Sequence, residues 1–134
     1  MKWLKRLLGS KKTATLVFGI GQKIIISEDT IYIGRGKETL DLDKDPKLEN
    51  LITKVGHDII IKKTVMTSGI SKKHAMLTKS GRGIYTIIDQ GSTMGTFVNA
   101  IRISPGAVIN LQNKDKVELS GVGQKAIIRF QILY

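Results

Sequence analysis

The sequence predicts an all-β protein, an antiparallel β-sandwich of about eleven strands. Short runs rich in Ile, Val, Thr and Tyr recur along most of the chain. Turn residues, mainly Gly, Asn, Asp and Pro, separate these runs, and only one stretch has the apolar spacing of a helix. The expected strands are residues 13–18, 23–27, 30–33, 58–61, 75–77, 84–89, 97–98, 101–103, 107–111, 116–119 and 125–133.

The length and composition are those of a single globular domain. With 134 residues the chain can bury a core, and 41% hydrophobic and 25% charged residues are ordinary values. The absence of cysteine excludes a disulfide framework and thiolate metal sites, and it fits a reducing, cytoplasmic location. No apolar run approaches the roughly 18 residues of a membrane span, and a signal-peptide pattern is missing.

The net charge of +11 is unevenly distributed. Residues 1–12 contribute +5, residues 13–49 contribute −2, and residues 50–134 contribute +8. A positive field of this kind favours an acidic partner, which leaves phosphate, nucleic acid and anionic lipid as candidates.

The first twelve residues are expected to form a basic tail ahead of a domain that spans 13–134. Apolar residues at positions 3, 4, 7 and 8 would share one face of a helix, flanked by basic side chains. One interpretation is peripheral membrane contact, or docking of a partner, through residues 1–8. Two helical turns are marginal in water, so a frayed tail is the favoured interpretation.

Segment 36–57 interrupts the strand pattern, which indicates an insertion in the domain. Asp45 suits a helix N-cap, Pro46 suits the first helical position, and Leu48, Leu51 and Ile52 would form a buried face. We therefore expect a short helix around residues 45–54.

No metal site is expected. Asp41, Asp43 and Asp45 alternate as at the start of a calcium loop, but Pro46 and Ile52 occupy the positions that need Gly and Glu. His57 has no second ligand nearby, so zinc is not indicated.

Two short motifs suggest an anion site. Gly34-Arg35-Gly36 is expected to end the third strand, where the planar guanidinium of Arg35 could bond two phosphate oxygens. Ser71-Lys72-Lys73-His74 lies on a loop between strands and offers a hydroxyl and two ammonium groups. Taken alone, each motif is better explained as part of an ordinary solvated surface.

A third motif completes an ordered set. Residues 89–99 read D-x-G-S-T-x-G-T-F-V-N, a hydroxyl-rich loop that leads into a strand and a hairpin turn at Asn99. Gly34-Arg35, Ser71-x-x-His74 and this motif, in this order on an all-β background, resemble the forkhead-associated (FHA) domain. The resemblance extends over residues 13–134 and includes a closing strand pair near residues 111–121.

The resemblance implies an eleven-stranded sandwich of the SMAD/FHA type that binds phosphothreonine peptides through loops at one end. It implies that Arg35, Ser71 and Lys72 contact the phosphate, that Thr93 lines the peptide groove, and that a small recess for the threonine methyl disfavours phosphoserine. The motif positions implied to be structural are Gly34, His74, Gly95 and Asn99.

The sequence departs from the family pattern in two places. Met94 stands where the family commonly has an Asn whose side chain clamps the peptide backbone, and a thioether cannot do so. Segment 36–57 is longer than the family usually needs. It could shield the site or select basic peptides, although a plain surface loop is favoured.

The leading hypothesis is therefore a phosphothreonine-binding interaction module that acts downstream of a Ser/Thr kinase. The alternatives are a phosphate-independent or self-associating scaffold and, less favoured, binding to nucleic acid or anionic membrane. Nucleic acid is not expected, because aromatic residues make up only 5% of the chain. No catalytic motif, P-loop or cofactor signature is present, so an enzyme is not expected.

Overall fold

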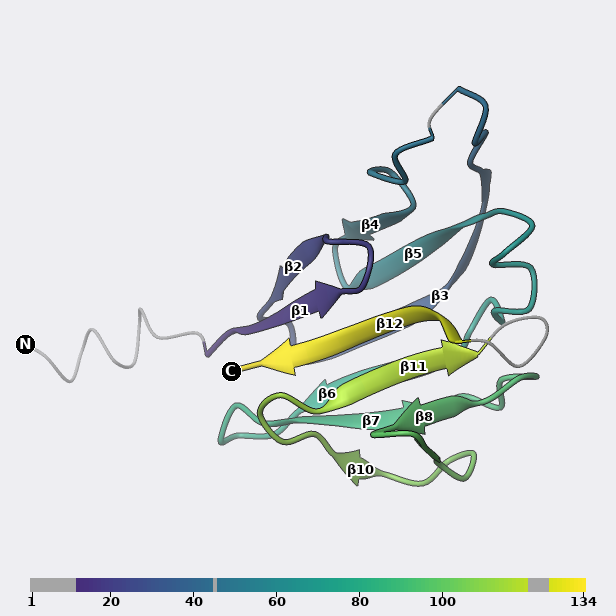
Figure 1. The fold of residues 1–134 in the computed structure, drawn as a ribbon. Helices are drawn as coiled ribbons and strands as arrows, with labels where there is room; N and C mark the ends of the chain where they lie inside the picture. The colour runs from purple at the N-terminus through teal and green to yellow at the C-terminus, as the bar shows by residue number, and fades with distance from the viewer. Residues whose placement is uncertain (1–11, 45, 121–125) are drawn as a thin grey trace, which may run out of the picture.

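The computed structural model describes residues 12–44, 46–120 and 126–134, and it contains two sheets that pack face to face (Figure 1). The first sheet is, in spatial order, β2 (Lys23–Ile26), β1 (Ala14–Phe18), β12 (Ala126–Leu133), β11 (Lys116–Ser120), β8 (Thr96–Val98) and β9 (Ile101–Arg102). The second is β10 (Ile109–Asn110), β7 (Tyr85–Asp89), β6 (Ala75–Lys79), β3 (Thr30–Thr39), β5 (Asp58–Lys63) and β4 (Ile52–Val55).

This arrangement confirms the predicted all-β sandwich and corrects two of its details. The described residues form twelve strands rather than eleven, and the additional strand is β4. The second sheet is mixed, because β3 and β5 pair in parallel while the other pairs are antiparallel. Parallel neighbours need a connection of about a dozen residues or more. Residues 40–57, between β3 and β5, supply it, and we call them the crossover segment.

The prediction of a short helix around residues 45–54 is wrong. Residues 46–51 form turns, and Leu48 has a φ of 60°, a left-handed conformation that cannot continue a right-handed helix. Ile52 then begins β4 and pairs with Ile61 of β5. The apolar spacing that suggested a helical face instead reflects Leu51 and Ile52 being buried next to each other where a strand begins.

The third strand is longer than expected. It does not end at Gly34-Arg35-Gly36 but continues to Thr39, with an irregular register against β5 between Arg35 and Thr39. Arg35 therefore extends from a strand held on one side by β5, where it lies opposite Ile61. This pairing is non-local, so the local Gly-Arg-Gly pattern did not reveal it.

The core lies between the sheets and is formed by the inward-facing residues of both. Phe18 and Phe130 pack with ring centroids 5.3 Å apart. Tyr85 is fully buried, and its hydroxyl donates a 2.8 Å hydrogen bond to the carbonyl oxygen of Glu28. Burial raises the pKa of Tyr85 to about 12, so the hydroxyl stays protonated and keeps this bond.

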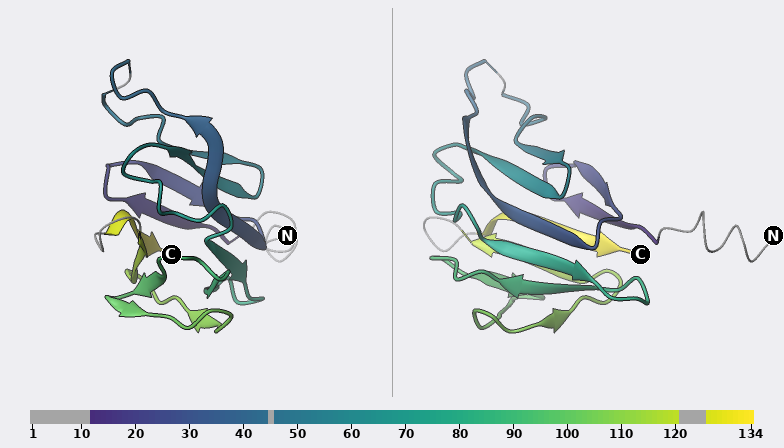
Figure 2. Two further views of the ribbon diagram at one scale, coloured as in Figure 1. Left: turned by 90° about the vertical axis from the view of Figure 1, so that its right-hand side faces the viewer. Right: turned by 180° about the vertical axis from the view of Figure 1, so that it is seen from behind.

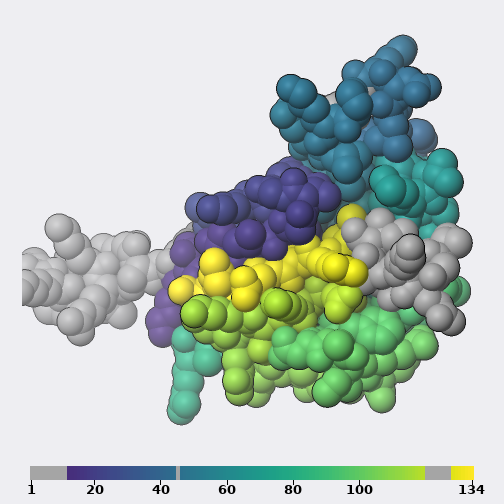
Figure 3. All heavy atoms as spheres, viewed as in Figure 1, coloured from purple at the N-terminus to yellow at the C-terminus, as the bar shows by residue number. Residues whose placement is uncertain are grey.

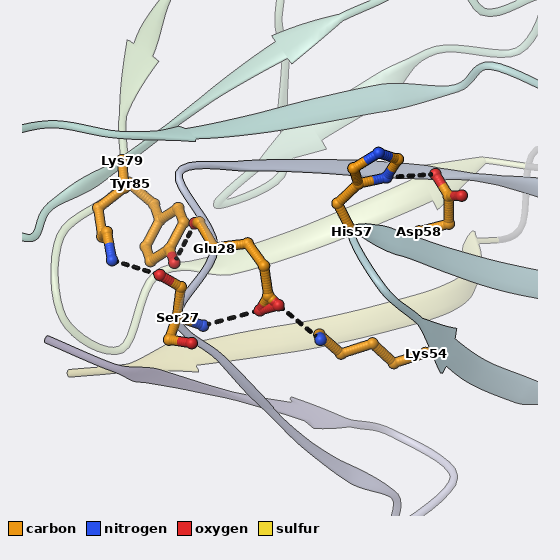
Figure 4. Close-up of polar contacts among 7 residues, drawn as sticks. All are labelled: Ser27, Glu28, Lys54, His57, Asp58, Lys79 and Tyr85. Atoms are coloured by element: carbon orange, nitrogen blue, oxygen red, sulfur yellow. Dashed lines mark hydrogen bonds and ion pairs between the residues drawn. The ribbon is translucent and has the colours of Figure 1, made fainter. Parts of the chain in front are cut away.

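The crossover segment projects from one end of the sandwich (Figures 2 and 3). Leu42 and Leu48, partly buried, pack it against the core. Strand β4 is tied to the body by an ion pair of 2.6 Å between Lys54 and Glu28 (Figure 4). In the same network Lys79 donates to the carbonyl oxygen of Ser27, so the β2–β3 turn contacts three other strands.

Some sequence-based predictions lie outside the described residues, namely the amphipathic pattern of residues 1–8 and the N-cap at Asp45. Within the described ranges, no helix is long and apolar enough to span a membrane, and no group of three or more His, Asp or Glu side chains could hold a metal ion.

Candidate functional site

Two loops meet at one end of the sandwich. The loop between β5 and β6, residues 64–74, and the loop between β7 and β8, residues 90–95, lie at the end toward which β3 runs (Figure 1). The N–H of Thr93 donates a 3.1 Å hydrogen bond to the Ser71 hydroxyl oxygen, which joins the two loops directly. The Ser71 hydroxyl thus accepts one bond, and because it donates none within the described part of the chain, its proton is available for an anion.

His74 lies buried beneath both loops. Its Nδ1 accepts a 3.2 Å hydrogen bond from the N–H of Ser71, and its Nε2 donates a 2.8 Å bond to the carbonyl oxygen of Gly95. A ring nitrogen that accepts a backbone N–H carries no proton, so these two bonds define a neutral imidazole. Burial lowers the pKa of His74, although the bond to Gly95 and the charge of Asp89 act in the opposite direction.

Asp89 organises the loop between β7 and β8 from within. Its carboxylate accepts bonds from the hydroxyls of Ser92 and Thr96, at 2.5 and 2.7 Å, and from the N–H groups of Gly91 and Ser92, both at 3.2 Å. Burial acts to raise the pKa of Asp89, but the bonds from Ser92 and Thr96 outweigh it and the pKa is lowered. A buried carboxylate with four donors stays ionised and fixes the loop.

Asp89 and Ser92 were not predicted to be site residues. The signal is the spacing, because an Asp three residues before a Ser can accept that residue's backbone N–H and hydroxyl in a local turn. Ser92 in turn holds Gly95 in place, because its hydroxyl oxygen accepts a 3.0 Å bond from the N–H of Gly95. Gly95 has a φ of 99°, which is favourable only for glycine.

Arg35 stands on β3 beside the first loop. Its backbone N–H donates a 3.0 Å bond to the carbonyl oxygen of Ser71, and its Nη1 donates a 2.7 Å bond to the carbonyl oxygen of Ser68. Its Nε is buried and has no hydrogen-bond partner among the described residues. An unpaired buried donor on a guanidinium is costly, which distinguishes Arg35 from an ordinary surface arginine.

Gly34 allows this close approach of the loop to β3. A β-carbon on Gly34 would overlap the carbonyl group of Lys72, so no larger residue fits while the loop keeps its place. The N–H of His74 bonds the carbonyl oxygen of Ile33 at 2.9 Å, which continues the contact along the strand. The loop is thus attached to β3 on both sides of Gly34.

The structure brings together most of the residues that the sequence suggested. Ser71, Thr93 and the structural positions around His74 form one connected cluster, with Arg35 beside it and Lys72 exposed on the same loop. Asn99 lies apart, at the β8–β9 turn. It has a φ of 48° there and bonds Asp115 at 2.9 Å.

Met94 lies half-buried in the loop between β7 and β8. Its neighbour Thr93 is exposed, so the loop presents a hydroxyl and a thioether side by side. A thioether is at most a weak acceptor and donates no hydrogen bond.

The guanidinium of Arg35, the hydroxyl of Ser71 and the ammonium group of Lys72 come from β3 and the adjoining loop, and such a set of donors is suited to binding phosphate. A model of the FHA domain matches residues 31–120, which include all of these side chains. The chain belongs to the FHA-domain family.

Solved structures support the same fold. One, from a structural and functional analysis of phosphothreonine-dependent FHA domain interactions, is 19% identical, covers 91% of this chain and 96% of its own, and has a TM-score of 0.58. The FHA domain of an Arabidopsis thaliana hypothetical protein is 22% identical with coverages of 92% and 86% and a TM-score of 0.64.

Mycobacterium tuberculosis EmbR, solved with a low affinity phosphopeptide, is 16% identical, covers 94% of this chain and 25% of its own, and has a TM-score of 0.60. At these identities the likeness establishes the shared fold. A search of curated proteins finds no match to this FHA domain.

Proposed function

We propose that this FHA domain binds phosphothreonine-containing peptides and so recruits proteins that a Ser/Thr kinase has modified. The observation that carries the proposal is the convergence of Arg35 and Ser71. They are joined by a 3.0 Å backbone bond, and among the described residues neither the Nε of Arg35 nor the hydroxyl proton of Ser71 has a hydrogen-bond partner. EmbR, a neighbour in fold, was solved with a phosphopeptide, which is consistent with this role.

The chemistry of the proposal is recognition without catalysis. A phosphothreonine carries nearly two negative charges near neutral pH and three acceptor oxygens. Arg35, Ser71 and Lys72 could supply at least three hydrogen bonds, each worth about 1.5–3 kcal/mol when one partner is charged. The phosphate would therefore provide most of the binding free energy. The loops would position the peptide and would catalyse no reaction.

The test is phosphopeptide binding by Arg35→Ala, with Arg82→Ala as the matched control. Arg82 is an exposed arginine in the β6–β7 turn, on a different element from Arg35, Ser71 and Lys72. We expect Arg35→Ala to lose binding while its unfolding transition stays cooperative, and we expect Arg82→Ala to bind as the wild type does. Wild-type affinity in a folded Arg35→Ala variant would refute the assignment of the site.

Met94 supports a second candidate, a domain that binds a partner without phosphate. The half-buried thioether cannot donate the hydrogen bonds with which an amide at this position would hold a peptide backbone. Treatment of the partner with phosphatase separates the two functions. Loss of binding supports the phosphothreonine reader, and unchanged binding supports the phosphate-independent scaffold.

A further inference from the structure

A groove of about 930 Å³ runs along the outer face of the second sheet. The strands of this sheet are seen from behind in the right-hand view of Figure 2. We call it the β3–β5 groove. It is lined by outward-facing residues of three adjacent strands, among them Tyr32 and Gly36 of β3, Ile60 and Lys62 of β5, and Thr53 and Val55 of β4. Its volume lies within the range of protein ligand sites.

The crossover segment builds one wall of this groove. Strand β4 belongs to segment 36–57, whose purpose the sequence left open, and it adds Thr53 and Val55 beside β5. The wall is fixed in place, because Lys54 pairs with Glu28 (Figure 4). In addition, the side-chain amide of Gln22 donates a 2.6 Å bond to the carbonyl oxygen of Ile52. The groove is therefore a built feature of the sheet.

The groove combines exposed apolar surface with positive charge. Tyr32 and Val55 are 45% and 61% exposed, although both are large hydrophobic residues. Five cationic side chains line the groove, against two acidic ones. Within the described residues only one of the five, Lys62, pairs with a carboxylate, that of Glu38 at 3.8 Å. The cations are Arg35, Lys37, Lys62, Lys72 and Lys73, and the acids are Glu38 and Asp58.

The groove is continuous with the phosphate site. Arg35 and Lys72, which the proposed function assigns to the phosphate, also line the groove. A chain that leaves a bound phosphothreonine on this side would enter it directly. From Tyr32 to Glu38 the groove follows six residue steps of β3, about 20 Å, which matches roughly six residues of extended peptide.

We infer that the β3–β5 groove binds an extended segment of the same phosphorylated partner, rich in acidic and aliphatic residues and flanking the phosphothreonine. The inference rests on the proposed function and adds to it a second contact surface. Acidic side chains would pair with the lysines on the rim, and aliphatic ones would cover Tyr32 and Val55. The partner would thus be selected over a longer sequence than the loops alone can contact.

The test compares two phosphothreonine libraries, one with about three and one with about ten degenerate residues on each side of the phosphothreonine. Each is bound to the wild type, to Val55→Glu and to Val108→Glu. Val108 is the matched control, because it is also 61% exposed but does not line the groove. Lys37→Glu is paired in the same way with Lys23→Glu, since both are exposed strand lysines and only Lys37 lines the groove.

We expect the long library to bind the wild type at least about fivefold more tightly than the short one, with Asp, Glu, Leu, Ile and Val enriched beyond the third flanking position. Val55→Glu should remove this gain and leave binding of the short library unchanged. Lys37→Glu should weaken the acidic preference, and both control variants should behave as the wild type.

Three results would overturn the inference. Equal binding of the two libraries, or a gain that Val55→Glu and Val108→Glu reduce equally, refutes the groove while the proposed function stands. A dimer in solution that Val55→Glu dissociates would mean that a second copy of the chain occupies the groove. Failure of even the short library to bind refutes the proposed function, and this inference with it.

Discussion

The N–H of Ser71 donates a hydrogen bond to Nδ1 of His74 at 3.2 Å, so the proposed phosphate-binding loop rests on an imidazole that must be neutral. The other ring nitrogen bonds the carbonyl oxygen of Gly95 at 2.8 Å on the second loop. A protonated ring would turn Nδ1 into a donor and place it against the Ser71 donor. The geometry of both loops therefore depends on the protonation state of one buried side chain.

The first prediction concerns pH. Because burial lowers the pKa of His74 below its ordinary value of 6.5, the unfolded chain binds a proton more readily than the folded one. The contribution of His74 to the free energy of unfolding should be constant above about pH 6.5 and should fall below it, by at most about 1.4 kcal/mol per pH unit for one proton. Urea denaturation between about pH 5 and pH 8 measures this slope.

His57 provides the control for this prediction. It is an exposed histidine at the β4–β5 turn. His74→Gln should reduce the slope of the wild type below pH 6.5, whatever its effect on stability at neutral pH, and His57→Gln measures any contribution of the other histidine, which lies 3.2 Å from Asp58. A slope that survives in His74→Gln would show that another group is responsible.

The second prediction concerns the loop between β7 and β8. Asp89→Asn keeps the shape of the side chain but removes the charge and turns two oxygens that accept four hydrogen bonds into one oxygen and one donor. We expect a loss of about 1.5–3 kcal/mol in the free energy of unfolding, together with weaker phosphopeptide binding. Denaturation and binding titrations check the two effects.

Asp43→Asn is the matched control for Asp89→Asn. Asp43 is exposed in the crossover segment, and its carboxylate accepts no hydrogen bond within the described part of the chain. It should change stability by less than about 0.5 kcal/mol. Equal effects of the two variants would mean that the Asp89 network does not hold the loop.

The third prediction concerns Gly34. A β-carbon there would overlap the backbone carbonyl of Lys72, which cannot move without displacing the Ser71 loop. Gly34→Ala should therefore weaken phosphopeptide binding strongly and lower stability. Gly81→Ala, at a turn where an added β-carbon meets nothing within 4 Å, should leave binding unchanged. Normal binding by Gly34→Ala would show that the loop position is not needed.

The fourth prediction concerns Met94. Met94→Asn restores the amide that FHA domains commonly carry at this position, and one net hydrogen bond is worth about 1 kcal/mol, or roughly fivefold in affinity. We expect tighter phosphopeptide binding by Met94→Asn but not by Met94→Ala, which removes the thioether without adding an amide. Titration of both variants with one phosphopeptide decides the point, and no gain in Met94→Asn would show that the amide does not reach the peptide.

The sequence predicted those parts of the structure that local patterns control. Alternating Ile and Val residues placed most strands, and turn chemistry identified Asn99 as a left-handed position, where its φ is 48°. The motifs also located the loops around Ser71 and Thr93. These features depend on residues within a few positions of one another, where periodicity and turn preferences apply.

The errors arose where distant segments decide the structure. Residues 46–54 have helical spacing, but pairing of Ile52 with Ile61 on β5 makes the last part of that stretch a strand. The parallel pairing of β3 with β5 extends β3 past Arg35, and no local signal reports a partner more than twenty residues away. The spacing of Asp89 and Ser92 is a local signal, but the burial that makes the carboxylate depend on its four donors is visible only in the packed structure.

The most direct test of the central claim is binding of the wild-type domain to three oriented peptide libraries that differ only at their central residue. The three residues are phosphothreonine, phosphoserine and unmodified threonine. We expect selective binding of the phosphothreonine library, and we expect Arg35→Ala to lose that binding. Equal binding of all three libraries, or no binding by a folded domain, would contradict it.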